Sequence, residues 1–174
     1  MGDRRVEIVD ADAVETAAAE MGQGGHYALA PELASSSIAV AVLDLSEVRL
    51  FNDARFPWVL LIPRRPGIVE LFDLARADQR CLVDEIALVA AFLKATTGCA
   101  KINIASIGNM VSQLHVHLVA RSPHDGNWPV SPWDGSRAEP YQAEAWTARA
   151  RELREALTCW TAASLSTATS QASG

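Results

Sequence analysis

The sequence has few cysteines, no long apolar run and no concentrated positive charge. Its three cysteines, Cys81, Cys99 and Cys159, lie far apart and form no Cys-x-x-Cys pair. This argues against a disulfide framework and against a cysteine-rich zinc site. No apolar stretch approaches the roughly 20 residues needed to cross a bilayer, and the charged N-terminus lacks the apolar core of a signal peptide. We therefore expect a cytoplasmic protein with no membrane partner.

Positive charge is scarce as well. The chain has 15 Lys and Arg against 21 Asp and Glu, a formal net charge of −6, and no long basic run. Binding to nucleic acid through its phosphates needs a concentrated basic face, so we expect no nucleic-acid partner. A small anionic ligand is still compatible with this composition, because a few well-placed donors are enough to hold one.

The remaining composition is that of an ordinary globular domain. The chain has 174 residues, of which 49% are hydrophobic and 21% are charged, enough for one domain. Residues 1–25, which end in a glycine-rich stretch, are predicted to be an N-terminal extension. Residues 26–160 are predicted to form a single domain. The small polar residues of 161–174 predict a disordered tail.

Five short segments have the pattern of β-strands, separated by turn residues and by one long helix. They are Ile38–Leu43, Val48–Phe51, Trp58–Ile62, Lys101–Ser106 and Gln113–Ala120. Three strands in close succession, a helical crossover and two further strands predict an α+β domain whose five-stranded sheet is mostly antiparallel.

Two helices are expected beside this sheet. In the first, which follows the third strand, apolar residues recur at spacings of four, three and four: Leu82, Ile86, Val89 and Leu93. Asp73 is its expected N-cap, and Gly98 lies where a helix commonly ends. Pro140 is expected to open a second, C-terminal amphipathic helix. Its apolar stripe consists of Trp146, Ala150, Leu153, Leu157 and Trp160.

The segment from Gly108 to Arg121 contains the candidate chemistry. Alternate side chains of a strand share a face, so Gln113, His115 and His117 are expected to point one way while the apolar residues between them face the core. A neutral imidazole is a competent nucleophile near neutral pH, and a second histidine on the same face can exchange a proton. The backbone N–H groups of the preceding residues 108–111 can face a phosphate.

Two other readings of this pattern stay open. A His-x-His pair on a strand is often a surface pair with no catalytic role. The pair can also share a zinc ion with His124 or Asp125, although no third ligand stands at a short, fixed spacing.

The same segment resembles the signature of the histidine triad (HIT) superfamily, in which three histidines alternate with hydrophobic residues. Here Gln113-Leu-His115-Val-His117-Leu-Val stands in that frame. The resemblance covers roughly residues 26–133. Further matches follow in the family's order: Asn52-Asp53, the segment from Pro57 to Arg65, Asn103, and Asn127-Trp128-Pro129.

The resemblance implies a function for these residues. His115 matches the histidine that attacks the α-phosphate and forms a nucleotidyl intermediate, and His117 matches the one that assists the leaving group. It implies a homodimer that acts on a nucleotide, with a purine nucleoside phosphate as the expected substrate, and without a metal or other cofactor. The implied substrate contacts are Asn52 or Asp53 at the ribose, Asn103, Gly108, Asn109, Met110 and Val111 at the phosphate, and Trp128.

Two departures from the family pattern bear on activity. Gln113, expected to be a catalytic residue together with His115 and His117, replaces the first histidine, as in small bacterial proteins similar to diadenosine polyphosphate hydrolases. It can hydrogen-bond but cannot titrate. Met110 stands where the family usually has Ser or Thr beside the leaving group. The alternatives to a hydrolase or transferase are therefore a nucleotide-binding protein with vestigial catalysis, and a metal-binding or structural module.

Several conspicuous residues are assigned no part in the chemistry. His26 and His124 are expected at the surface and in a turn. Arg64, Arg65 and Arg121 are expected to be solvated, because they follow strands. The remaining tryptophans are assigned to packing or to a subunit interface: Trp133, Trp146 and Trp160.

Overall fold

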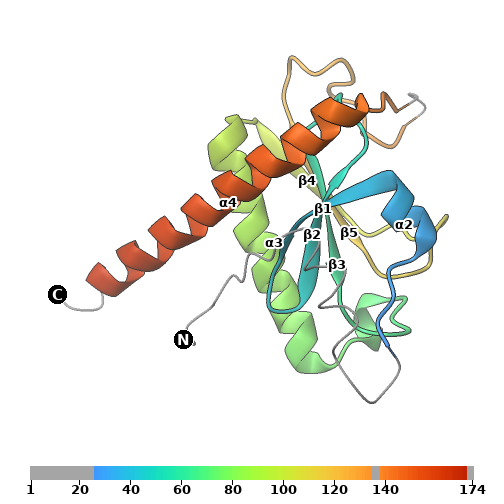
Figure 1. Ribbon diagram of the computed structural model, residues 1–174, viewed down its shortest axis with the longest axis vertical. Coiled ribbons are helices and arrows are strands. Elements are labelled where there is room, and N and C mark those ends of the chain that lie inside the picture. Colours follow the sequence, from blue (N-terminus) through green and yellow to red (C-terminus); the bar gives the residue numbers. More distant parts are fainter. Residues whose placement is uncertain (1–25, 135–137, 172–174) are drawn as a thin grey trace.

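The computed structural model describes residues 26–134 and 138–171, with side chains described as far as residue 162. The predicted N-terminal extension, residues 1–25, lies outside the described residues. Figure 1 shows a central sheet with helices packed against it. None of the helices in the described part of the chain combines the length and the hydropathy that a membrane span requires.

The five-stranded sheet is confirmed, and every strand pair in it is antiparallel. The strands stand in the order β1-β2-β3-β5-β4, so β4 and β1 form the two edges. Their bounds are β1 Ser37–Val42, β2 Ser46–Phe51, β3 Trp58–Pro63, β4 Lys101–Ala105 and β5 Val116–Arg121. The histidine-bearing strand β5 therefore lies inside the sheet, between β3 and β4.

Strand β5 begins three residues later than the sequence predicted. Residues 113–115 are bound outside the ladder: the Leu114 N–H donates to the Ile68 carbonyl over 3.0 Å, and the Ser106 hydroxyl donates to the His115 carbonyl over 3.1 Å. Their backbone groups are thus satisfied by loops and not by a neighbouring strand. His117 is in the sheet, whereas Gln113 and His115 form the approach to it.

The long helix after the third strand is α3, Arg76–Thr97, and it ends as predicted at Gly98, which has the left-handed φ of 63°. Its predicted start was wrong. Asp73 belongs to η1, a short 3-10 helix over Leu71–Asp73, where its carboxylate and that of Glu70 form a reciprocal capping box. The Asp73 carboxylate is engaged there, and α3 begins after Ala75 without a side-chain cap.

The C-terminal helix α4 spans Ala143–Gln171, starting three residues after Pro140. We expected a disordered tail from residue 161, but the structure continues the helix through Gln171. A physical reason is that extending an existing helix adds one hydrogen bond per residue fixed, and alanine favours this strongly. A further short helix, α2 over Pro31–Ser36, was not predicted.

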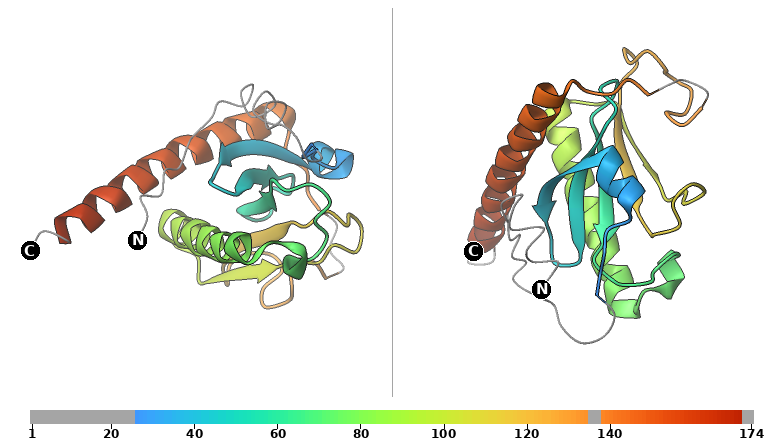
Figure 2. Two further views of the ribbon diagram at one scale, coloured as in Figure 1. Left: turned by 90° about the horizontal axis from the view of Figure 1, so that it is seen from below. Right: turned by 45° about the vertical axis from the view of Figure 1, so that its right-hand side comes forward.

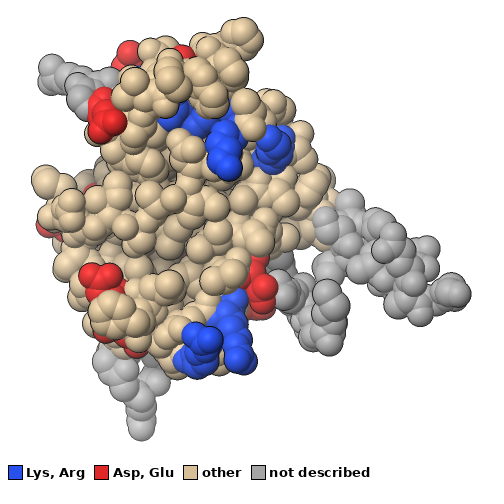
Figure 3. Space-filling view, turned by 180° about the vertical axis from the view of Figure 1, so that it is seen from behind, with Lys and Arg blue, Asp and Glu red and all other residues tan. Residues whose placement is uncertain are grey.

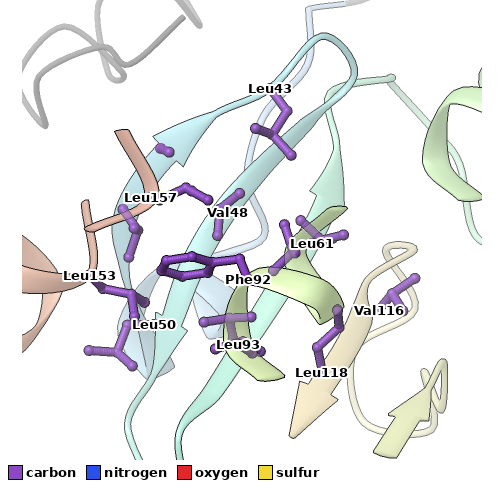
Figure 4. Close-up of a cluster of buried hydrophobic side chains, with 14 of the residues drawn as sticks. Leu43, Val48, Leu50, Leu61, Phe92, Leu93, Val116, Leu118, Leu153 and Leu157 are labelled. Atoms are coloured by element: carbon purple, nitrogen blue, oxygen red, sulfur yellow. The ribbon is translucent and has the colours of Figure 1, made fainter. Parts of the chain in front are cut away.

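The sheet separates two apolar clusters. Helices α3 and α4 cover one face, where Phe92 and Leu93 of α3 and Leu153 and Leu157 of α4 meet the strands (Figure 4). Val116 and Leu118 of β5 belong to this cluster, as the alternation predicted. Figure 2 shows α2 on the opposite side of the sheet. The smaller cluster on that side contains Leu33, Phe56, Trp58, Leu60, Ile62 and Val119.

Candidate active site

His115 and His117 lie side by side on the α2 side of the sheet. The register of β3 and β5 places His117 opposite Leu60, whose side chain belongs to the α2-side cluster. The two imidazole rings have centroids 4.9 Å apart and are tilted by 68°. Their side chains are almost completely buried, with 6% and 8% exposed for the two residues. The structure therefore brings the two predicted catalytic histidines together.

The hydrogen bond of His115 determines which of its nitrogens can react. Its Nδ1 lies 2.7 Å from the backbone carbonyl oxygen of Gln113. Because a carbonyl oxygen only accepts, Nδ1 must carry the hydrogen, and in a neutral imidazole Nε2 then holds a free lone pair. The nitrogen left for an incoming electrophile is Nε2.

His117 is held in the opposite tautomer. The indole Nε1 of Trp58 donates to its Nδ1 over 3.0 Å. An indole N–H only donates, so Nδ1 of His117 holds the lone pair and Nε2 carries the hydrogen. Burial, and after it the neighbouring His115, lower the pKa of the His117 imidazole to about 3. At neutral pH His117 is therefore an uncharged donor.

A cleft of about 380 Å³ opens beside the two histidines, between α2, the sheet and the loop 107–111. A volume of this size is within the range of small-molecule sites. Most lining side chains are apolar, namely Leu33, Phe51, Leu60, Ile107, Met110, Val111 and Trp133. Glu32 is the one charged residue among those that line it, and no Lys or Arg does.

The loop predicted to cradle a phosphate does lie at this cleft. Gly108, Asn109, Met110 and Val111 all line it together with the histidines. Gly108 has a φ of +69°, a left-handed conformation that favours glycine. Met110 is 96% exposed. The loop thus presents mainly backbone groups and apolar side chains.

Gln113 bonds to His115 through its backbone, whereas its side chain bonds to the segment before α2. Its Oε1 accepts a hydrogen bond from the Ala30 N–H over 2.8 Å, and its Nε2 donates to the Ala28 carbonyl over 3.0 Å. The amide therefore holds the segment that leads into α2, one wall of the cleft. Its backbone carbonyl is the group that orients His115.

Asn52 and Asp53, expected at a ribose, lie outside the residues that line the cleft. The Asn52 side-chain oxygen accepts from the Tyr141 N–H over 2.9 Å. The buried Asp53 carboxylate forms an ion pair with Arg55 and accepts from the Glu139 N–H. Both side chains hold the segment that leads into α4.

Asn103 and Trp128 belong to a second polar assembly that we call the Arg121 cluster. It consists of Arg121, its ion-pair partner Asp125, the Asn103 side chain, the Val130 carbonyl and the rings of Phe56 and Trp128. The expectation that Arg121 is solvated was wrong, because the residue is 1% exposed. Its donors are satisfied within the chain: Nε and Nη2 reach Asp125 over 2.8 and 2.9 Å, and Nη1 reaches Asn103 over 3.2 Å. These hydrogen bonds hold the pKa of the Asp125 carboxyl at about 2.

The other polar residues named with the histidines stay apart from them. Arg121 engages Asp125, and exposed His124 is in the turn that follows β5. Among the described residues no three His, Cys, Asp or Glu side chains are grouped so that they could hold a metal ion. On the face shown in Figure 3, Lys and Arg form small separate groups and not a continuous surface.

Aromatic residues around His117 were missed by the sequence reading. Trp58, Phe51 and Trp133 have ring centroids 5.5, 6.2 and 5.7 Å from the His117 ring. Trp133 had been assigned only to packing or a subunit interface. Alternation within β3 does place Trp58 and Leu60 on one face, but only the β3–β5 pairing shows that His117 lies on the same side.

Comparison with known proteins identifies the family to which this fold belongs. The sequence model of the HIT domain matches residues 33–124. The crystal structure of a histidine triad protein from Sinorhizobium meliloti 1021 matches this fold with a TM-score of 0.70. The two sequences are 43% identical, and the match covers 74% of this chain and 96% of that one. Another, from Bradyrhizobium japonicum, is 39% identical with a TM-score of 0.70, over 75% and 98% of the two chains.

A third histidine triad protein, from Marinobacter aquaeolei VT8, is 32% identical with a TM-score of 0.72, over 77% of this chain and 98% of its own. The chain belongs to the histidine triad (HIT) domain family. No curated protein matches it.

Proposed function

We propose that the protein is a nucleotide phosphate hydrolase or nucleotidyl transferase that works through a covalent nucleotidyl intermediate on His115. The observation that carries this proposal is the hydrogen bond from His115 Nδ1 to the Gln113 carbonyl. It leaves the Nε2 lone pair of a buried, oriented imidazole beside a cleft. An oriented nucleophile of this kind can divide one difficult displacement into two easier ones.

In the first step, Nε2 of His115 attacks the α-phosphorus, and the bond from phosphorus to the leaving group breaks with its electron pair going to the leaving group. The Nε2–H of His117 donates a hydrogen bond to the departing atom. In the second step, a water molecule, or an acceptor hydroxyl in a transferase, attacks the same phosphorus and loses its proton to solvent. The phosphorus–nitrogen bond breaks, which restores His115 and releases a nucleoside monophosphate or its ester.

The cleft has features that suit a nucleoside phosphate. Its apolar side chains, which include Leu33 and Phe51, can pack against a base, and the 108–111 backbone lies on the side of the histidines. A purine nucleoside phosphate is the substrate class that we propose. Because the resemblance to the HIT family implies a nucleotide substrate, a nucleotide is the first ligand to test.

A nucleotide-binding protein with vestigial catalysis is the second candidate, and Met110 is the observation that favours it. The loop 108–111 has no hydroxyl side chain, and Met110 points into solvent with 96% of its surface exposed. A leaving group would then receive assistance from His117 alone. Tight nucleotide binding without turnover is the expected behaviour in that case.

The test is to trap the intermediate. The full chain is mixed with nucleoside phosphoramidates, acyl adenylates and dinucleoside polyphosphates in turn, then quenched in mild alkali, because phosphohistidine is acid-labile. Peptide mass spectrometry should find a nucleoside monophosphate on the peptide that contains His115. An adduct on another residue would contradict the mechanism. Binding of a nucleotide with neither adduct nor turnover would support the second candidate.

A further inference from the structure

Trp58 makes a hydrogen bond that has no role in the proposed function. Its indole Nε1 donates to Nδ1 of His117 over 3.0 Å, and the two rings lie 5.5 Å apart between centroids. We propose that Trp58 is a positioning residue that keeps His117 in its neutral Nε2–H tautomer, so that His117 assists a leaving group by a hydrogen bond and not by giving up a proton. The part of this proposal that concerns the leaving group rests on the proposed function; the tautomer does not.

The geometry of the contact between Trp58 and His117 fixes the tautomer. Both hydrogen-bonding roles are fixed, because an indole nitrogen can only donate and the Nδ1 atom that faces it must accept. Protonation of Nδ1 would place two N–H groups against each other at 3.0 Å, so the imidazolium form requires this contact to break. Trp58 is 3% exposed and packs against the rings of Phe51 and Trp133, with centroids 4.7 and 5.5 Å away. Its indole therefore has little room to turn aside.

The surroundings of His117 contribute little charge. The elements packed against its ring contribute Phe51 from β2, Trp58 from β3 and Trp133, and none of these side chains titrates near neutral pH. The titratable groups that share the cleft are His115 and Glu32. Glu32 is exposed and lies on α2, where its charge is screened by water. Burial and His115 both oppose a charge on His117 and lower its pKa.

The consequence is chemical selectivity. The N–H of a neutral imidazole is a very weak acid, so it can stabilise developing negative charge but cannot fully protonate a departing atom. When Nε2 of His115 bonds to phosphorus and the bond to the leaving group breaks, that group must be stable as an anion. Carboxylates, phosphates and acidic phenols satisfy this condition. Amines and aliphatic alcohols, which need a proton to leave, should react more slowly unless the solvent supplies it.

The tautomer can be measured without a substrate. Long-range proton–nitrogen NMR correlations of the full chain with labelled histidine should show His117 with an unprotonated Nδ1 and a protonated Nε2, unchanged between pH 5 and 8. Trp58→Phe keeps the ring and removes the donor, and it should populate the Nδ1–H tautomer. The matched control is Trp133→Phe, because Trp133 also lies beside His117 but its indole Nε1 has no hydrogen-bond partner among the described residues. In this variant the His117 signals should keep the wild-type tautomer.

Two results would overturn the proposal. One is a wild-type His117 that carries a proton on Nδ1 or titrates between pH 5 and 8, a result that stands even if Trp58→Phe fails to fold. The other is a folded Trp58→Phe variant whose His117 tautomer is the same as in the wild type.

The selectivity is tested with nucleoside 5′-aryl phosphates of graded phenol acidity. The wild-type rate should fall steeply, by at least about tenfold, from the most to the least acidic phenol. If bond cleavage limits turnover and the rate still does not depend on phenol acidity, His117 transfers a proton. That result would overturn the proposed leaving-group selectivity. If no substrate is turned over at all, the proposed function fails, and the NMR result still decides the role of Trp58.

Discussion

His117 and Arg121 stand four residues apart on the same face of β5, and they differ in how much of their hydrogen-bonding capacity the protein itself uses. The Nε, Nη1 and Nη2 groups of Arg121 all donate hydrogen bonds, to Asp125, to Asn103 and to the Val130 carbonyl. Each histidine has one nitrogen held by the protein and, within the described residues, no partner at Nε2. The polar groups of the Arg121 cluster stabilise the fold, whereas the histidines keep a nitrogen available for a ligand.

The polar residues expected at the substrate differ from the histidines in the same way. Asn52, Asp53 and Asn103 have the right chemistry for binding ribose or phosphate, but their oxygens are engaged within the chain. None of the three lines the cleft, where apolar side chains surround the two histidines. Unused hydrogen-bonding capacity beside a cavity identifies a candidate site better than polarity does.

The largest expected effect is on turnover, at the histidine side of the comparison. His115→Ala should lower kcat/KM by at least about 10³-fold, because removing a nucleophile abolishes the covalent route. His124→Ala is the matched control, since His124 is exposed in the turn after β5, and it should retain wild-type kcat/KM. The measurement is the steady-state rate with the best substrate of the screen. Comparable rates in His115→Ala and His124→Ala would rule out the mechanism.

The next effect is on stability, at the Arg121 side. Arg121→Ala removes the ion-pair partner of the Asp125 carboxylate, which then keeps only the Ser122 and Asn127 N–H groups, and should lower the free energy of unfolding by up to about 3–5 kcal/mol. Arg149→Ala removes an exposed ion pair with Glu152, whose side chains are 39% and 61% exposed, and should cost less than about 1 kcal/mol. Urea unfolding measures both. Equal losses in the two variants would show that the Arg121 cluster does not stabilise the fold.

Acid should affect the two regions at different pH. Unfolded His117 has the ordinary pKa of 6.5 and folded His117 about 3, so between these values only the unfolded chain binds the proton. The free energy of unfolding should therefore fall as the pH drops below 6.5, by up to about 1.4 kcal/mol per pH unit. For Asp125 the corresponding window is 3.8 down to about 2. His117→Asn should flatten the first window in urea unfolding and Asp125→Asn the second; an unchanged slope in either variant would contradict the assignment.

A smaller effect, on KM, is expected at Gln113. Its backbone carbonyl bonds to His115, and its side chain bonds to one wall of the cleft. Gln113→Ala removes the partner of the half-buried Ala30 N–H and of the exposed Ala28 carbonyl, at a cost of about 1 kcal/mol. Because that segment leads into α2, KM should rise about tenfold while kcat changes little. Gln113→His should lose less, since imidazole can also donate and accept. Gln142→Ala, at an exposed glutamine, is the control. If Gln113→Ala and Gln142→Ala had the same KM, the Gln113 amide would be dispensable.

Substitutions at the β4 edge of the sheet should affect the chemistry least, and should act on dimerisation. At the β1 edge, Arg154 donates to the Ala39 and Val40 carbonyls, whereas β4 forms the other edge and its Ile104 is 50% exposed. We infer a homodimer that forms through β4, with a mass near twice 18.7 kDa in analytical ultracentrifugation. Ile104→Lys should yield monomers, and Val130→Lys, at a site that is 48% exposed, should not. A native chain that sediments only as a monomer at micromolar concentration would contradict the inference.

Features that depend on neighbouring residues were predicted well from the sequence. The strand segments, the long helix and its end at Gly98 follow from local periodicity and from the conformational freedom of glycine. The alternation of His115 and His117 with core residues, and the position of the 108–111 loop beside them, were also read correctly. Asp73 shows the limit of local reasoning, because two capping arrangements competed for one carboxylate.

Long-range pairing decided the rest. The sequence by itself determined which residues can be nucleophile and hydrogen-bond donor, since that depends on side-chain type and strand period. Only the tertiary structure decided that Gln113 binds a segment more than 80 residues away, that Trp58 faces His117, and that Asn103 faces Arg121. The physical reason is that hydrogen bonds form between groups that folding brings within about 3 Å, and strand order and register, which set those encounters, are global properties of the sheet.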